Sequence, residues 1–355
     1  MKRILHLITT IDKGGAENQL LLLVEQQIKF GAEVGVVALK GRNELENDFQ
    51  AVGATLYLSH TGKNPILQIL YLRRLIRRLG YEIVHAHLPR AELIASFACG
   101  SNPLVVSRHN SEPFFPNSPK VISRSLSKFV EKRSRYLIFI SRTAKEYAVN
   151  QKEACDSSKS RIVYYGTKPS TSQHPRANKG FPIKVITVGR LVSQKDHLTQ
   201  IKAISLLPKG KYQLSIYGEG ELFSDLEREI ENLGLHSSII LHGKVEKVLP
   251  KLLDSDLFIL SSCYEGFGLV LLEALEAGLP IMASDIGTTR EVLGENFMYY
   301  FPVGGFKELA ELIAEFGETQ QYNYSPLVKR LALFGIKESA IKIDEIYEEA
   351  LNHIR

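Results

Sequence analysis

The 355-residue chain has few cysteines, and they are not spaced for a disulfide framework or a metal site. Its three cysteines, Cys99, Cys155 and Cys263, lie far apart and form no C-x-x-C pair. Small secreted scaffolds and zinc ribbons both depend on closely spaced cysteines. The pattern therefore argues against both classes and fits a protein that works in a reducing compartment.

Long apolar runs are also absent, since no segment approaches the roughly 20 apolar residues that span a bilayer. The N-terminus, Met1–Ile8, begins like a signal peptide, but its apolar part is short and contains His6. The Asp-Lys-Gly-Gly sequence that follows does not resemble a cleavage site. We therefore interpret this segment as a first buried strand of a protein that we expect to be cytoplasmic.

Two ligand-binding signatures are missing as well. The Gly14-Gly15 pair and the Gly218-Glu-Gly220 segment are not G-x-G-x-x-G, because Phe223 stands where the second segment would need its third glycine. This argues against NAD binding. No D-x-D pair follows an expected strand, so we expect no metal site of that kind and no cofactor.

The overall composition is that of a globular protein, with 44% apolar and 23% charged residues. A length of 355 residues predicts two domains. The formal charge of +5 is unevenly spread, because residues 1–175 carry a net +11 and residues 176–355 a net −6. A basic first half and an acidic second half suggest separate partners.

One stretch of the second half combines two carboxylates with a glycine loop. The apolar run 257–260 predicts a buried strand, and the residues after Gly268 predict an apolar helix that ends at Gly278. Glu265 then lies on the loop, and Glu273 lies inside the helix. The amides of the helix N-terminus between them form a natural anion site.

Two carboxylates at this spacing could also belong to a glycosidase or to an ordinary buried helix. A glycosidase pair would need both groups aimed at one bond, roughly 5–10 Å apart. A buried helix that merely carries two acidic residues is the simpler structural interpretation. Burying the Glu273 carboxylate in an apolar helix is costly unless it is paired, so we expect this carboxylate to have a partner.

The segment from Glu265 to Glu273 reads E-G-F-G-x-x-x-x-E and resembles the EX7E signature of retaining glycosyltransferases with the GT-B fold, in particular the GT4 family. The resemblance implies that Glu273 binds the ribose hydroxyls of a nucleotide and that Glu265 contacts the donor sugar. It also implies that the loop backbone faces the sugar and the phosphates, through Gly266, Phe267, Gly268 and Leu269.

Two cations follow another expected strand, 183–188. Arg190 and Lys195 lie where this strand leads into the next helix, although cations oppose the dipole at a helix N-terminus. They suit a diphosphate, since Arg can bind two oxygens and Lys adds a point charge. The segment resembles the G-R-x-x-x-x-K motif of GT4 enzymes, which implies that both side chains neutralise the leaving nucleoside diphosphate.

The first half alternates short apolar runs with helical patterns, which predicts a parallel sheet covered on both faces. Ligands bind at the carboxyl ends of such strands, where His87, His109 and Ser141 are expected. A histidine at this place is more often structural than catalytic. The expected strands are 2–8, 33–39, 54–59, 82–86, 103–107, 136–140 and 161–165, and the expected helices are 16–30, 65–79, 91–99 and 120–133.

Two further segments of the first half resemble GT4 enzymes. Ser107-Arg-His109-Asn110 is similar to the T-x-H segment, which implies that His109 lies near the donor sugar and the acceptor hydroxyl in a catalytic role. The loop with Gly14 and Gly15 is similar to the glycine loop beside the donor diphosphate, which adds Gly15 to the donor-binding residues. His87 is only a pocket candidate.

The resemblance implies a fold class and a division of the chain. We expect an α/β protein of GT-B type, with two Rossmann-like domains facing a central cleft and a C-terminal helix that crosses back. The expected parts are an acceptor-binding domain over 1–168, a linker over 169–182, a nucleotide-sugar domain over 183–336 and the returning helix over 337–355.

Basic helical stretches at 71–79 and 124–135 explain the charge of the first half. A solvated helix face is the default interpretation. The alternative is peripheral contact with anionic lipid on the inner face of the cell membrane. Nucleic acid is disfavoured, because the arginines lack interleaved aromatic residues.

The sequence therefore predicts a metal-independent, retaining glycosyltransferase of the hexosyltransferase type. Its substrates would be a UDP- or GDP-linked sugar and a glycan, lipid-linked or polysaccharide acceptor of the cell envelope. Two other hypotheses remain open at this point: a sugar-nucleotide isomerase similar to the 2-epimerases, and a non-catalytic glycan-binding protein. Transfer, conversion of donor without acceptor, and absence of turnover would distinguish the three.

Overall fold

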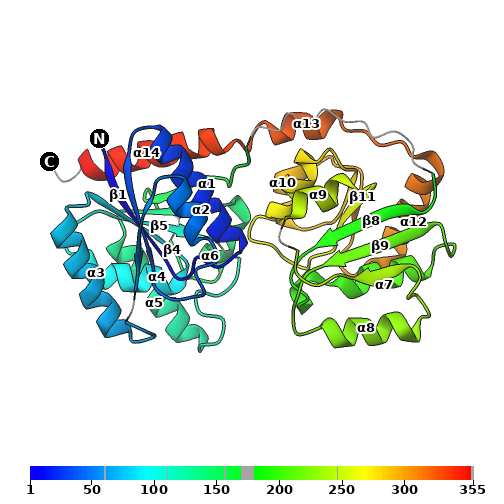
Figure 1. The fold of residues 1–355 in the computed structure, drawn as a ribbon, viewed down its shortest axis with the longest axis horizontal. Coiled ribbons are helices and arrows are strands. Elements are labelled where there is room, and N and C mark those ends of the chain that lie inside the picture. The colour runs from blue at the N-terminus through cyan, green and yellow to red at the C-terminus, as the bar shows by residue number, and fades with distance from the viewer. Residues whose placement is uncertain (60, 110, 156, 169–179, 246, 353–355) are drawn as a thin grey trace. The chain divides into compact units, whose positions relative to one another are not determined.

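A computed structural model describes residues 1–352 except 60, 110, 156, 169–179 and 246 (Figure 1). The chain divides into two compact units, of which unit 1 comprises Met1–Lys168 with Phe334–Arg355 and unit 2 comprises Pro169–Leu333. The chain returns to unit 1 at Phe334, slightly before the boundary at residue 336 that the sequence suggested. Most of the expected linker, 169–179, lies outside the described residues.

Unit 1 is built on a seven-stranded sheet of order β3-β2-β1-β4-β5-β6-β7, in which all paired strands are parallel. The strand order reverses between β1 and β4, and the carboxyl ends of both strands meet there. Such a switch point is where ligands bind in open parallel sheets. The strands are β1 (Arg3–Ile8), β2 (Glu33–Ala38), β3 (Thr55–Leu58), β4 (Ile83–His87), β5 (Leu104–Arg108), β6 (Tyr136–Phe139) and β7 (Ser160–Ile162).

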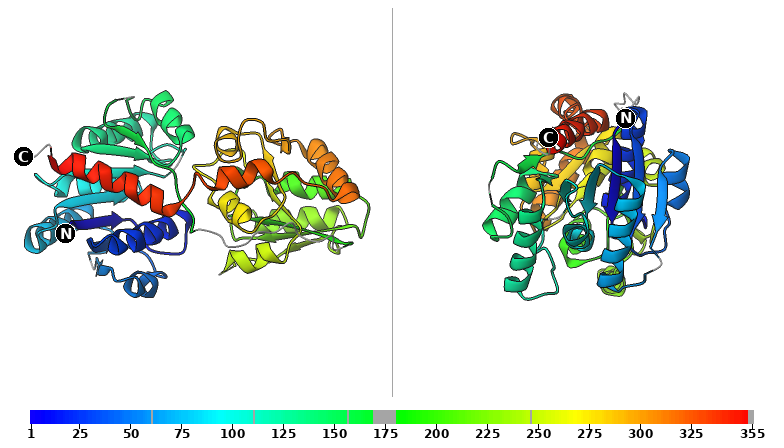
Figure 2. Two further views of the ribbon diagram at one scale, coloured as in Figure 1. Left: turned by 90° about the horizontal axis from the view of Figure 1, so that it is seen from above. Right: turned by 90° about the vertical axis from the view of Figure 1, so that its left-hand side faces the viewer.

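Helices follow the strands of unit 1 and cover both faces of its sheet (Figure 2). The C-terminal helix α14 belongs to this unit, because Ile343 and Tyr347 pack into one apolar cluster with Ile4 and Ile83. The expected return of the last helix to the first domain is thereby confirmed. The helices are α1 (Gly15–Lys29), α2 (Glu46–Ala51), α3 (Pro65–Leu79), α4 (Pro89–Ala98), α5 (Lys120–Arg133), α6 (Arg142–Asn150) and α14 (Ile336–Asn352).

Unit 2 repeats this architecture with a six-stranded parallel sheet of order β10-β9-β8-β11-β12-β13. Its order reverses between β8 and β11. The strands are β8 (Ile183–Val188), β9 (Tyr212–Tyr217), β10 (Ile239–Leu241), β11 (Leu257–Leu260), β12 (Ile281–Ser284) and β13 (Tyr300–Phe301). The helices are η1 (Ser193–Lys195), α7 (His197–Ser205), α8 (Phe223–Asn232), α9 (Val248–Leu253), α10 (Leu269–Glu276), α11 (Gly287–Leu293), α12 (Phe306–Thr319) and α13 (Ser325–Leu331).

In unit 1 the segment before Lys168 lies directly against the start of the returning C-terminal segment. Thr167 pairs with Gly335 in a parallel bridge, and the side-chain amide of Gln19 donates to the Gly166 carbonyl at 3.0 Å and accepts from the Gly166 amide at 3.1 Å. A Cβ atom at Gly166 would lie 2.4 Å from the Cα atom of Ile336. Only glycine therefore permits this approach of the two backbones.

No helix among the described residues combines the length and the apolar character needed to cross a membrane.

Both sheets have cores of short, nearly continuous apolar strands, as expected for parallel sheets buried on both faces. In β1, for example, Ile4, Leu5, Leu7 and Ile8 are fully buried.

Candidate functional site

The candidate donor-binding residues of unit 2 come from two loops that follow neighbouring strands. The loop after β8 carries Arg190 and Lys195, and the loop after β11 carries Glu265. Because β8 and β11 are parallel and adjacent, both loops leave the same edge of the sheet. This is the switch point of unit 2.

Hydrogen bonds tie these two loops together. The side-chain amide of Gln194 donates to the Tyr264 carbonyl at 2.9 Å, and the Cys263 amide donates to the Gln194 carbonyl at 2.8 Å. Ser261 Oγ lies 2.9 Å from the carbonyl oxygen of Lys195, to which it can donate. The backbone that presents Lys195 is thus held directly against the end of β11.

Lys195 and Glu265 form an ion pair, with side chains that are only 15% and 7% exposed. Ser262 Oγ also donates to the Glu265 carboxylate at 2.6 Å, and Thr288 Oγ1 donates to the Glu265 carbonyl at 2.8 Å. The pair is therefore fixed in place by neighbouring hydroxyl groups. Two residues that the sequence analysis selected separately thus meet in one ion pair.

Arg190 lies on the same loop but at its exposed side. Its guanidinium donates to the Gln194 side chain at 3.3 Å, and among the described residues no carboxylate pairs with it. Since Gln194 also bonds to the β11 loop, Arg190 is connected to that loop. Its positive charge is available to an anion from solvent.

Helix α10 begins directly after this loop, at Leu269. Its N-cap residue Gly268 has a φ of +75°, a left-handed conformation that glycine adopts without strain. Gly266 lies in the loop, while the Phe267 side chain is 2% exposed and packs inside the unit, so Phe267 can offer a ligand only its backbone. The first amides of α10 are oriented toward the same edge of the sheet.

Glu273 lies one turn inside α10 and is half-buried. Burial raises the pKa of this carboxyl group to about 7, and the neighbouring Glu276 contributes in the same direction. Among the described residues, none makes a hydrogen bond or ion pair with the Glu273 carboxyl group. The sequence predicted a partner for the Glu273 carboxylate, and the described part of the chain does not supply one.

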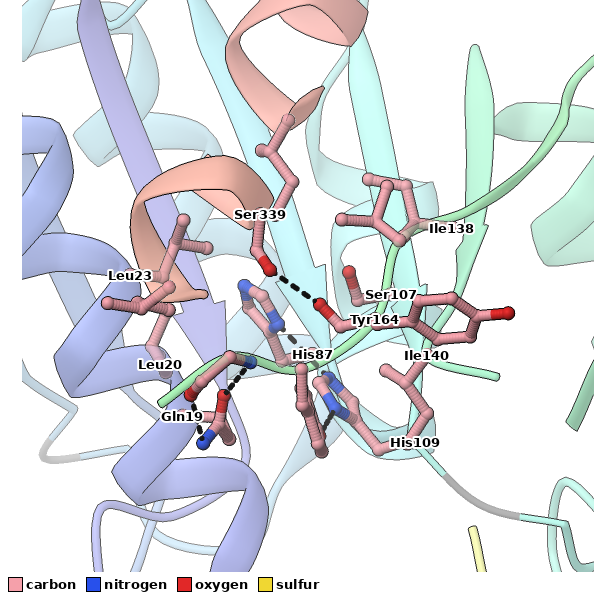
Figure 3. A pocket seen from close by; sticks show the side chains of 15 residues that line it. Gln19, Leu20, Leu23, His87, Ser107, His109, Ile138, Ile140, Tyr164 and Ser339 are labelled. Atoms are coloured by element: carbon pink, nitrogen blue, oxygen red, sulfur yellow. Dashed lines mark hydrogen bonds between the residues drawn. The ribbon is translucent and has the colours of Figure 1, made fainter. Parts of the chain in front are cut away.

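In unit 1, His109 follows β5 and belongs to a group of hydrogen-bonded histidines (Figure 3). Its Nε2 atom lies 3.1 Å from Nδ1 of His87, and its Nδ1 atom bonds to the Tyr165 hydroxyl. Burial lowers the pKa of His109 to about 3, so the ring is neutral near pH 7. His109 is therefore not a general acid in this state, and both of its nitrogens are already engaged.

A small cavity of about 30 Å³ lies beside this group, lined among others by Gln19, His87, His109 and Ser339 (Figure 3). This space exceeds the roughly 10–15 Å³ that a single water molecule needs. The histidine group therefore borders on a hollow in unit 1 that is accessible at least to water.

The remaining donor-binding candidate of unit 1, Gly15, is the first residue of α1 and follows the carboxyl end of β1. Gly14 forms the N-cap, and a Cβ atom there would lie 2.5 Å from the Glu17 carboxylate. Glu17 in turn accepts from the Thr10 hydroxyl at 2.8 Å. Gly15 and His109 thus both lie at the carboxyl edge of the unit 1 sheet.

His6, His85 and His87 form the one group among the described residues with potential metal-ligating atoms within 4.8 Å of one another. All six ring nitrogens of these histidines already take part in hydrogen bonds within the protein. The group contains no carboxylate to balance a buried cation. We therefore interpret it as a hydrogen-bonded network, and metal independence stays a prediction.

His6 and His85 were not predicted from the sequence. The available signal was the alternation in His85-Ala-His87, which places both rings on one face of β4. His6 lies opposite His85 in the parallel register of β1 and β4. The bonding partners Gln27 and Tyr347 come from helices and gave no signal, because their contact depends on tertiary packing.

Comparison with known proteins gives two family models that together span most of the chain. The model for glycosyl transferases group 1 matches residues 170–329, and the model for glycosyltransferase family 4 matches residues 13–170. EpsF of Bacillus subtilis, which is named as a glycosyltransferase, is 24% identical over 316 residues, covering 81% of this chain and 80% of EpsF.

A second curated relative is the UDP-Gal:alpha-D-GlcNAc-diphosphoundecaprenol alpha-1,3-galactosyltransferase of Escherichia coli, 28% identical over 251 residues and covering 64% of each chain. Among solved structures, Anabaena HepE in complex with UDP superposes with a TM-score of 0.77 at 19% identity, covering 98% of this chain and 100% of that one. A glycosyltransferase from Rickettsia africae gives 0.81 at 17% identity, covering 99% of both chains. These structures share the fold of this chain.

Proposed function

Because this chain belongs to the GT4 family of group 1 glycosyltransferases and has the GT-B fold, we propose that it transfers a hexose from a nucleotide-sugar to an envelope glycan acceptor with retention of configuration. The observation that carries this proposal is the site at the switch point of unit 2. There Lys195, anchored by Glu265, lies on the loop next to the one that leads into α10. Both curated relatives described above are named as transferases, which favours transfer over the isomerase alternative.

The donor is proposed to bind through its diphosphate and its ribose. Arg190, Lys195 and the first amides of α10 would hold the phosphates, and the two cations would supply the balancing charge without a metal ion. Glu273 would accept hydrogen bonds from the ribose hydroxyls. The complexes of HepE with UDP and with UDP-glucose support a uridine nucleotide.

Retention is proposed to proceed by attack from the face of the leaving group. A double displacement would need a carboxylate free to act as nucleophile. Glu265 is instead bound to Lys195 and Ser262, so its geometry suits positioning of the cation and of the sugar rather than nucleophilic attack. The leaving diphosphate, stabilised by Lys195 and Arg190, would remain close to the incoming hydroxyl.

The acceptor is proposed to be a lipid-linked or polysaccharide glycan that binds to unit 1. Two relatives support this class, since the name of the E. coli protein contains a diphosphoundecaprenol acceptor and another relative, from Bacillus subtilis, is a poly(glycerol-phosphate) alpha-glucosyltransferase. His109, as a neutral ring at the carboxyl edge of the unit 1 sheet, would orient the acceptor hydroxyl.

Nucleotide binding tests the donor site through its pH dependence. The Glu273 carboxyl has a pKa of about 7 in the free protein, and hydrogen bonds from ribose hydroxyls favour its ionised form. Binding should therefore release a proton, and UDP affinity should rise between about pH 6 and pH 8. Calorimetry in buffers of different ionisation enthalpy measures both effects, after a thermal-shift screen of UDP, GDP and ADP has selected the nucleotide.

The control for this titration is Glu273→Gln, which keeps the shape of the side chain and removes its titration. Any pH dependence that belongs to the diphosphate itself persists in this variant. Equal proton release by the variant and the natural protein would contradict the assignment of Glu273.

Membrane contact is proposed to use the exposed side of α3. Leu72, Leu75 and Ile76 are buried in the core, so the apolar face expected for lipid is not available. The first turns of the helix nevertheless expose Ile66, which is 66% exposed, and Leu70, which is 55% exposed. The exposed arginines of the same helix lie further along it, and they are Arg73, Arg74, Arg77 and Arg78.

Flotation with vesicles tests this contact. We expect binding to anionic vesicles at low salt and release at high salt, because each arginine near an anionic surface contributes about 1 kcal/mol and salt screens this attraction. Replacing Arg74, Arg77 and Arg78 with glutamine should abolish flotation, whereas neutral vesicles serve as the control. Absence of binding even at low salt would end the proposal.

A further inference from the structure

The histidines of unit 1 form a continuous chain of hydrogen bonds that ends at an amide. From its outer end the chain runs from the Tyr165 hydroxyl to Nδ1 of His109, and from Nε2 of His109 to Nδ1 of His87 over 3.1 Å. It continues from Nε2 of His87 to Nδ1 of His6 over 2.9 Å, and from Nε2 of His6 to Oε1 of Gln27 over 2.8 Å. Gln27 and His6 are only 2% and 0% exposed.

A second branch begins at the other end of the same amide. Nε2 of Gln27 donates to the Tyr347 hydroxyl at 3.3 Å. This hydroxyl lies 2.6 Å from Nδ1 of His85, whose Nε2 atom lies 2.8 Å from the Ser107 hydroxyl. Gln27 on α1 therefore joins two rows of polar groups, and Tyr347 on α14 belongs only to the second row.

The rings of both rows are neutral, because burial lowers the pKa of His6 to about 4, that of His109 to about 3, and those of His85 and His87 well below the ordinary value. A neutral imidazole has one N–H donor and one acceptor nitrogen. Once the role of one nitrogen is known, the role of the other follows, and so does the role of the next ring in the row.

The amide of Gln27 supplies this starting point. Its oxygen can only accept, so Nε2 of His6 must carry the hydrogen and Nδ1 of His6 must accept from His87. By the same reasoning Nε2 of His87 and Nε2 of His109 both carry hydrogen. Nδ1 of His109 is then the acceptor, and it receives the Tyr165 hydroxyl hydrogen. If the amide were turned over, every donor in the row would become an acceptor.

We propose that Gln27 is a positioning residue that, through His6 and His87, holds His109 in the tautomer whose Nδ1 atom accepts a hydrogen bond from a hydroxyl group. Its value for catalysis rests on the proposed function, in which His109 orients the acceptor hydroxyl. The electron pair of such an Nδ1 atom, which Tyr165 occupies in this structure, can receive the acceptor hydroxyl in place of Tyr165, whereas an Nδ1–H group cannot accept at all. No proton transfer is required, only a fixed direction of donation.

The first test needs no substrate. Nitrogen-15 NMR of protein labelled in histidine distinguishes Nδ1–H from Nε2–H rings, and single substitutions assign the signals. We expect His6, His87 and His109 to be Nε2–H tautomers near pH 7. An Nδ1–H signal for His109, or a mixture of both forms, would overturn the proposal, and this result would not depend on whether the proposed reaction is correct.

The second test compares two variants at the same buried amide. Gln27→Met removes the oxygen that sets the row, so the tautomers of His6, His87 and His109 should become mixed, with kcat lowered by about 10- to 100-fold and the KM for donor unchanged. Tyr347→Phe removes a hydroxyl from the second row only and should leave the His109 tautomer and kcat as they are.

A third variant, Gln27→Glu, separates the two rows. A carboxylate accepts from both sides, so His109 should keep its Nε2–H form while His85 changes to Nδ1–H. Unchanged tautomers in a folded Gln27→Met protein, or equal losses of kcat in Gln27→Met and Tyr347→Phe, would show that the amide has a structural role only. If Gln27→Met does not fold, the NMR of the natural protein still decides.

Discussion

Replacing Lys195 with alanine should lower kcat by about 100- to 1,000-fold, the usual loss for one preorganised charge contact in a transition state. In the proposed reaction, negative charge would develop on the diphosphate as the sugar leaves, and the Lys195 ammonium is held at the switch point by Glu265 and by the loop bonded to Ser261. The substitution also leaves the Glu265 carboxylate, which is 7% exposed on its side chain, without its cation. Initial-rate kinetics with the selected nucleotide-sugar measure the effect.

Lys184→Ala is the matched control for this experiment. Lys184 lies on the same strand, β8, but near its amino end, where it pairs with Asp254 at 2.9 Å. Its removal should change kcat less than twofold, because exposed ion pairs contribute about 0–1 kcal/mol to stability and the site is at the other edge. Near-normal turnover of Lys195→Ala, or full loss of natural activity in a chelator, would contradict the proposed role of the cation.

Replacing Glu273 with leucine should have opposite effects on nucleotide affinity and on stability. Two hydrogen bonds from ribose hydroxyls to a carboxylate contribute about 1.5–3 kcal/mol each, so the Kd for the nucleotide should rise about 100-fold or more. Without nucleotide, the variant removes a half-buried carboxylate that no described residue pairs with, so the free energy of unfolding should increase by about 1–3 kcal/mol.

The gain in stability should depend on pH. The raised pKa means that the folded protein keeps the Glu273 proton up to about pH 7, whereas the unfolded chain loses it near the ordinary value of 4.5. The natural protein therefore loses stability as pH rises through this interval, and Glu273→Leu should not. Denaturant unfolding at pH 5 and pH 8 measures the difference.

Glu276→Gln, which removes another carboxylate from α10, should change nucleotide affinity little when affinity is measured at pH 8, where Glu273 is ionised with or without its neighbour. A Glu273→Leu protein that binds nucleotide normally would contradict the assignment. A variant that is less stable than the natural protein at pH 8 would show that the Glu273 carboxyl group is already paired.

The regular elements were predicted well wherever one pattern dominated. Strands β8 and β11 and helices α3 and α5 have the expected bounds, because each is a short apolar run or a clear amphipathic pattern between turn residues. The sequence suggested that strand β7 ends at Tyr165, but in the structure it ends at Ile162. The reason is tertiary, since Gly166 bonds to Gln19 and the Tyr164 carbonyl accepts from Ser339.

The candidate site was predicted in its parts but not in its connections. The motifs placed Lys195 and Glu265 at strand ends, yet their ion pair depends on β8 and β11 being neighbours, which no local pattern specifies. Likewise, His87 was expected just beyond a strand but is the last residue of β4, bonded on both sides to other histidines. Such networks join residues that are far apart in the sequence.

If the proposed function is correct, the ion pair between Lys195 and Glu265 has a consequence for the reaction cycle. The Lys195 ammonium is already held by a carboxylate, so it does not have to be ordered when the diphosphate departs. Little reorganisation of this group is therefore needed in the transition state. Afterwards the same carboxylate competes with the spent nucleotide for the ammonium. We therefore expect weak product inhibition, because the resting site regenerates its own counter-ion as the nucleotide leaves.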